Sequence, residues 1–168
     1  MCKAAERLDP ERTRTALETH ASEALKRSLP RAAPHLWYPA EAHLELLDLL
    51  WHHVALRDPD TMAELGGLAI GDDLRGAHRM LLRVLSPAYL IHTGSRLFRA
   101  YVNYGNMEVR ERDAFSAVVR LTLQPASEPF FMTAPGAVRA ALAHCGAEAV
   151  TLDAARHPDG IDLFLRWR

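Results

Sequence analysis

Apolar residues recur at helical spacing through the first hundred positions of the chain. The clearest case is residues 39–56, where Leu44, Leu47, Trp51 and Val54 mark one face. A repeat of about 3.6 residues predicts an amphipathic helix, and the width of this stripe predicts that the helix is central to the core. Thinner stripes predict further helices over residues 10–28, 58–71, 72–85 and 88–100.

Helix-start signals support these boundaries. Asp9, Asp58 and Ser86 each stand directly before a proline, so each can cap a helix whose first turn the proline favours. Three prolines fall in residues 29–39, which predicts a connector. Gly66, Gly67 and Gly71 lie inside a predicted helix, where they either weaken the helix or let a neighbour approach closely.

The hydrophobic period changes from helical to alternating after Gly105. Alternation over residues 107–123, with Phe115 among the inward positions and a turn near Asp113, predicts a hairpin with one buried face. A helix over residues 136–144 and a second hairpin follow. The strands of this second hairpin are expected at residues 149–152 and 161–167.

The fold class predicted from this order is α+β, with an N-terminal helical body packed on a C-terminal four-stranded antiparallel sheet built as hairpin, helix, hairpin. We expect residues 1–168 to form a single domain. Its parts are an N-terminal helix and Pro-rich connector (1–36), the helical body (37–102) and the sheet portion (103–168).

Composition narrows the class of protein. The chain is 49% apolar and 24% charged with a net charge of -1, which argues against disorder and against nucleic acid as a partner. No apolar run reaches the length of a membrane span, so we expect a cytoplasmic protein. Cys2 and Cys145 lie far apart without a partner motif, which fits a reducing compartment.

Catalytic and metal motifs are missing from the sequence. No serine or cysteine has the setting of a nucleophile, and no glycine run matches a phosphate loop, so we expect no catalytic residues and no enzyme. His52 and His53 are adjacent and diverge by about 100° on a helix, and His43 is not four residues from either, so no metal site is expected. His92, near a helix end, has the position of an axial haem ligand or of a histidine bonded to a carbonyl.

Aromatic residues gather where the helices give way to the sheet. They predict a concave apolar pocket, or alternatively plain core. Arginines in the same helix could orient an anionic ligand or simply be solvated. The candidate pocket residues are Tyr89, His92, Arg96, Phe98, Arg99, Tyr101, Tyr104, Phe115, Phe130 and Phe131.

Several short motifs carry a family resemblance. The order of Trp37-Tyr38-Pro39, Leu85-Ser86-Pro87 and Asn103-Tyr104-Gly105 resembles a myxobacterial paralogous family of uncharacterised proteins over residues 37–167. The later order, from Pro129-Phe130-Phe131 to Phe164-Leu165-Arg166-Trp167, resembles the wider fold shared by haem/nitric-oxide-binding, four-vinyl-reductase-type and vesicle-tethering-subunit proteins. This resemblance implies a ligand-binding or assembly fold.

One motif of the haem-binding branch is absent. That branch holds the haem carboxylates with Tyr-x-Ser-x-Arg, and the nearest stretch here, residues 115–120, has the wrong spacing. We therefore expect no cofactor and assign no haem-ligand role to His92.

Two functional hypotheses follow. The first is a non-enzymatic sensor or carrier domain in signalling, which binds an apolar or aromatic small molecule with one anionic end between helices and sheet. The second is a dimeric protein-protein interaction or scaffold module that binds no small ligand. An enclosed void favours the first, whereas a filled core with an exposed apolar patch favours the second.

Overall fold

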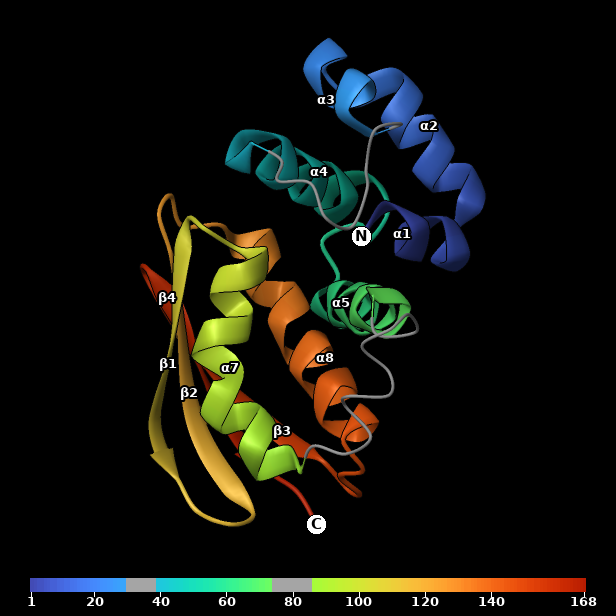
Figure 1. The fold of residues 1–168 in the computed structure, drawn as a ribbon. Helices are drawn as coiled ribbons and strands as arrows, with labels where there is room; N and C mark the ends of the chain where they lie inside the picture. The colour runs from blue at the N-terminus through green and yellow to red at the C-terminus, as the bar shows by residue number, and fades with distance from the viewer. Residues whose placement is uncertain (30–38, 74–85) are drawn as a thin grey trace.

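The computed structural model describes residues 1–29, 39–73 and 86–168, and it places the helices on one side of a four-stranded sheet (Figure 1). The helices are α1 (Cys2–Leu8), α2 (Pro10–His20), α3 (Glu23–Ser28), α4 (Ala40–His53), α5 (Pro59–Asp73), α7 (Pro87–Tyr101) and α8 (Glu128–His144). The strands are β1 (Gly105–Arg112), β2 (Ser116–Leu123), β3 (Thr151–His157) and β4 (Gly160–Arg166). The predicted α+β class and the order hairpin, helix, hairpin are confirmed.

The sheet is antiparallel throughout, in the order β1-β2-β4-β3, so β1 and β3 are its edges. Alternate residues of the two central strands are buried under the helices, among them Val119, Leu121 and Leu163. In β1 the register shifts between Val109 and Glu111, which makes Arg110 the extra residue of a bulge.

The N-terminal helical prediction over residues 10–28 needs a correction, because the helix is broken after α2. Ser22 caps α3 by accepting a hydrogen bond from the Leu25 N–H. The N–H and hydroxyl of Ser22 also donate to the Glu45 carboxylate of α4, at 2.7 and 2.8 Å. The break therefore provides polar contacts that attach the N-terminal helices to α4.

The central helix α4 ends three residues before its predicted end. Leu56 and Arg57 adopt left-handed backbone conformations, with φ of 53° and 63°, so the helix cannot continue through them. Asp58 then caps α5 as expected, since its carboxylate accepts from the Thr61 N–H. The helix predicted over residues 72–85 lies outside the described residues beyond residue 73.

Helix α8 begins eight residues before the predicted start at residue 136. Ser127 accepts from the Phe130 N–H as its cap, and Pro129 sits in the first turn, where a missing N–H costs nothing. Pro135 lies inside the helix. Sequence reasoning treats such a proline as a break, whereas here α8 continues through it against α5.

The two helices α5 and α8 touch backbone to backbone at glycines. A Cβ atom built on Gly136 would lie 1.6 Å from the Ala63 carbonyl oxygen, and one on Gly66 would lie 2.1 Å from the Thr133 carbonyl oxygen. Of the two alternatives for these glycines, close approach applies at Gly66, whereas a Cβ on Gly71 would meet no described atom within 4 Å. No helix in the described part of the chain is long and apolar enough to cross a membrane.

Candidate functional site

Four of the predicted pocket residues meet at one junction between α4, α7, α8 and the start of β1. The Phe98 ring of α7 and the Phe130 ring of α8 are edge to face with centroids 6.2 Å apart. Phe130 and Phe131 are likewise perpendicular at 6.1 Å. Tyr104 joins them through His43 of α4, whose ring lies 6.1 Å from Tyr104 and 6.2 Å from Phe130.

The polar centre of this junction is a hydrogen bond between His43 and Tyr104. Nδ1 of His43 lies 2.6 Å from Oη of Tyr104. Burial lowers the pKa of His43 to about 4 and raises the pKa of Tyr104 to about 12, so both groups are neutral near pH 7. A neutral phenol can donate to an unprotonated Nδ1, which satisfies both side chains without a charge.

Sequence reasoning considered His43 only as a metal ligand and missed this contact. The position of His43 in the sequence could have indicated the contact, because His43 lies on α4 four residues before Leu47, which is fully buried. A polar residue on the buried face of a helix needs a partner, and Tyr104 was already a candidate.

The aromatic junction is packed with the protein's own side chains. Phe131 is 1% exposed and Phe130 is 9% exposed. The Arg156 guanidinium of β3 stands 5.1 Å above the Phe131 ring, a cation–π contact that covers this side of the cluster. These contacts give the junction the character of core.

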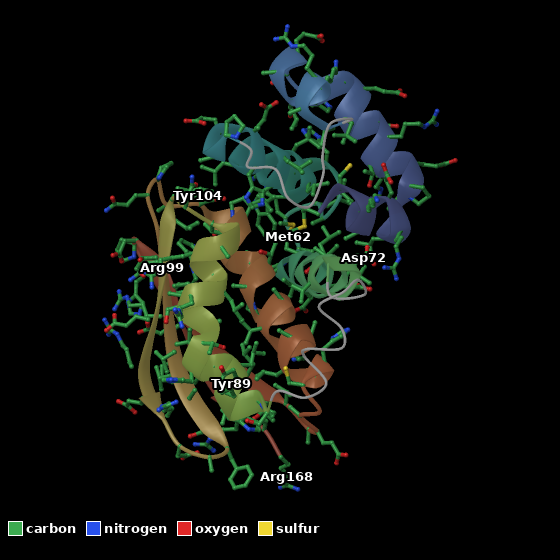
Figure 2. All side chains as sticks on the ribbon, viewed as in Figure 1. Met62, Asp72, Tyr89, Arg99, Tyr104 and Arg168 are labelled. Atoms are coloured by element: carbon green, nitrogen blue, oxygen red, sulfur yellow. The ribbon has the colours of Figure 1, made fainter. Side chains whose placement is uncertain are left out.

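The other predicted residues lie apart from the junction. Tyr89, His92, Arg96 and Arg99 are exposed along α7. Figure 2 labels two of them, Tyr89 and Arg99. Phe115 is not an inward strand residue, because it stands in the β1–β2 turn and is 64% exposed. Tyr101 ends α7, and its side chain lies outside the described part of the structure.

An open groove runs between α7 and the edge strand β1. It has a volume of about 450 Å³ and is lined by His92 and Ser95 of α7 and by residues 106–112. Arg99, one turn after Ser95, donates from Nε to the Ser95 carbonyl at 3.3 Å. Figure 2 labels Arg99, which stands near the end of α7 from which the chain passes into β1, and it is not among the residues that line the groove.

Positive charge exceeds negative charge around this groove. Arg96 and Arg99 are exposed on α7, and Arg110 and Arg112 are exposed on β1. Two glutamates lie among them, and one of these, Glu108, is 3.6 Å from Arg110. The lining itself holds two arginines and two glutamates, and the exposed Arg96 and Arg99 of α7 add positive charge beside it.

A second groove, of about 710 Å³, lies between α4 and the start of α8. Several of its polar side chains already have partners within the protein. His52 contacts Asp48 at 3.5 Å, and its Nδ1 accepts from Arg57 Nε at 3.0 Å. Glu45 is occupied by Ser22. This groove therefore offers fewer free polar groups to a ligand.

Catalytic and metal chemistry find no support in the described residues. No group of three or more histidine, cysteine or carboxylate side chains gathers there as metal ligands would. Burial is the main cause that raises the pKa of both thiols, Cys2 and Cys145, and a protonated thiol is a poor nucleophile.

Haem requires an axial side chain that faces an enclosed slot, with cations near its carboxylates. His92 is exposed and lines an open groove. His43 is buried, but its Nδ1 bonds to Tyr104 and the edge of its ring meets Phe130. Neither His92 nor His43 is therefore placed as an axial haem ligand.

Three solved H-NOX structures are similar to this chain in fold, at sequence identities of 12% or less. An H-NOX protein from S. oneidensis in the Fe(II)NO state has a TM-score of 0.66 at 10% identity, over 99% of this chain and 93% of that one. An Fe(II) unliganded H-NOX protein from K. algicida has a TM-score of 0.58 at 12% identity, over 99% and 94%. An oxygen-binding H-NOX domain related to soluble guanylate cyclases has a TM-score of 0.64 at 7% identity, over 99% and 90%.

No protein-family model matches the sequence, and no curated protein matches it. The resemblance to the myxobacterial family thus stays a prediction. The expected resemblance to the haem/nitric-oxide-binding fold is confirmed at the level of architecture. The chain has the fold of H-NOX domains, with which it shares little sequence.

Proposed function

We propose that this chain is a non-enzymatic sensor domain that has the H-NOX fold, works without haem, and binds an anionic ligand in the α7–β1 groove. The observation that carries the proposal is the groove itself. It brings His92 and Ser95 of α7 opposite Arg110 and Arg112 of β1, and the exposed Arg96 and Arg99 follow along α7 outside the lining. The junction that was expected to hold the ligand is filled by aromatic side chains.

The groove lining changes the kind of ligand that is expected. A pocket lined by the aromatic set would take an apolar molecule with one anionic end. The groove lining is mainly polar, and its apolar contributions come from Met107 and Val109. The anionic group is accordingly the main recognition element, and an apolar part has two side chains on which to rest.

Native mass spectrometry of the protein purified from its own source tests ligand binding. A stoichiometric extra mass supports the proposal if it is lost from Arg99→Glu and kept by Arg139→Glu. Arg139 is an exposed arginine of α8, so it controls for the change of charge. A bare wild-type mass, or an extra mass equally retained by Arg99→Glu, contradicts the groove as the site.

An absorbance scan of the same sample tests the absence of haem. We expect no Soret band. A Soret band that disappears in His92→Ala would overturn this part of the proposal, because it would show that His92 binds haem iron.

The dimeric scaffold is a second candidate, favoured by the filled junction and by an apolar patch on the uncovered sheet face. Phe164 of β4 is 43% exposed there, beside its cross-strand partner Val118. Light scattering should then give twice the chain mass, and Phe164→Ser should return the protein to a monomer. A monomer at all accessible concentrations would contradict this candidate.

A further inference from the structure

We infer that the stacked imidazoles of His20 and His53 form an acid-sensitive contact, which holds the N-terminal helices on α4 near neutral pH and loosens them as the pH falls. The two rings come from different helices, because His20 is the last residue of α2 and His53 is the last residue of α4. The contact lies outside the α7–β1 groove, so its action does not depend on a ligand there.

The two imidazole rings lie face to face. The ring centroids of His20 and His53 are 3.8 Å apart and the ring planes differ by 5°. Rings that are not both charged can stack in this way, since their faces bring apolar surface together. Two imidazolium rings at the same distance repel each other, because a like charge within about 4 to 6 Å disfavours the charged form. The stack is therefore favourable while one ring is neutral and unfavourable when both are protonated.

Other ionisable groups near the stack come from α4 and from the turn after it. The His52 ring lies 6.4 Å from the His53 ring, contacts Asp48 at 3.5 Å and accepts from Arg57 Nε at 3.0 Å. Burial is the largest cause that lowers the pKa of His53, followed by the charges of His20 and His52, whereas Asp48 acts in the opposite direction. In the unfolded chain this pKa is 6.5, so the unfolded chain takes up the proton first and the contact weakens as the pH falls below that value.

The carboxylates closest to His20 in the sequence of α2 and α3 are directed elsewhere. Glu18 of α2 diverges from His20 by about 200° around the helix axis, because successive residues of a helix are about 100° apart. Glu23 of α3 contacts Lys26 of the same helix at 3.4 Å. These two side chains therefore do not neutralise a second positive charge on the stack.

The stack stands beside the polar contacts that attach α3 to α4. His20 lies two residues before Ser22, which caps α3 and donates two hydrogen bonds to Glu45 of α4. Repulsion between the two rings would move the end of α2 away from α4, and α3 would follow because it starts directly after this point. Leu25 of α3 is 2% exposed, so the movement also exposes apolar surface and the open form stays a minor population. Arg7 attaches α1 to α5 separately, so we expect the loosening at residues 21–28.

Hydrogen exchange of the full chain, followed by mass spectrometry at pH 7 and pH 5, tests this contact. Protection of the amides of residues 21–28 is corrected for the intrinsic exchange rate at each pH. Between pH 7 and pH 5, wild type should lose about fivefold more of this protection than His20→Phe, because two unit charges about 4 Å apart in water repel by the corresponding free energy. The phenylalanine ring keeps the stack and does not titrate. His53→Phe should behave like His20→Phe, and the control His144→Phe, in α8, should respond like wild type.

Salt provides a second test that needs no variant. At about 1 M salt the screening length is about 3 Å, so the wild-type response should shrink toward that of His20→Phe. Equal loss of protection in wild type and in both stack variants would overturn the inference, as would a wild-type response that salt leaves unchanged. A loss of protection that is equally large in α8 would overturn it too, because the whole fold would then be opening.

Discussion

The hydrogen-bonded pair of His43 and Tyr104 predicts an acid-sensitive fold. Burial lowers the pKa of His43 to about 4, whereas in the unfolded chain the pKa is near 6.5. Between these values the unfolded chain takes up a proton that the folded chain does not, so stability falls as the pH falls through this window. The folded chain can bind this proton at Nδ1 of His43 only if that atom stops accepting the hydrogen bond from Tyr104 and the ring becomes charged.

The magnitude follows from the two pKa values. The pKa of His43 is about 2.5 lower in the folded chain than in the unfolded chain, a difference that corresponds to about 3 kcal/mol in the free energy of unfolding. About 2 kcal/mol of this stability is lost by pH 5. That loss is a large fraction of the 5 to 15 kcal/mol that holds a domain folded. Tyr104 predicts a loss of stability at high pH. Its pKa is about 12 in the folded chain and near 10 in the unfolded chain, so stability falls as the pH rises above 10.

Urea denaturation followed by circular dichroism at pH 7, 6 and 5 measures this effect. The matched variant is His43→Gln, whose amide can accept from the Tyr104 hydroxyl but does not titrate. The rest of the chain is the same in both proteins, so the difference between the two proteins isolates His43. We expect wild type to lose about 2 kcal/mol more than the variant between pH 7 and pH 5. A difference that stays constant over this range would refute the argument.

Three further predictions concern packing and capping, and urea denaturation at pH 7 checks each of them. Gly136→Ala should lower the free energy of unfolding by about 2 kcal/mol or more, because the new Cβ meets the backbone of α5. Gly71→Ala should be neutral or stabilising, because its Cβ meets no described atom within 4 Å. Equal losses in the two variants would contradict the helix contact. Phe131→Ala should lower the free energy of unfolding by about 3 to 5 kcal/mol, because Phe131 is 1% exposed. Phe115→Ala should lower it by less than about 0.5 kcal/mol, because Phe115 is 64% exposed. A large loss at Phe115 would contradict its place in the turn. Ser22→Ala should cost about 1 kcal/mol through the lost cap, and an unchanged midpoint would argue that the N-terminal helices are not attached there.

The architecture could be predicted from the sequence because its signals are local. The leucine stripe of α4, the proline entries of α5 and α7, and the alternation of β2 each identify an element within a few residues. The errors lie where tertiary contacts override local preference. Helix α8 passes through Pro135 because it packs on α5, and the N-terminal helix breaks at Ser22, where Glu45 offers a partner from a distant helix.

The candidate site was harder to predict than the fold. Aromatic residues near the junction of helices and sheet indicated a cluster, and Phe98, Tyr104, Phe130 and Phe131 do form one. A sequence does not show whether such a cluster encloses a void, because that depends on the distance between helices. Nor does it show that His92 turns toward an edge strand, since strand order decides which strand is free.

The glycine contact between α5 and α8 also bears on how these helices can move. Two backbones in direct contact have no side chains between them whose rotamers could absorb a displacement, so we expect α5 and α8 to shift together rather than past each other. Arg7 of α1 binds Asp72 of α5 at 2.6 Å, which joins the start of the chain to the same pair of helices.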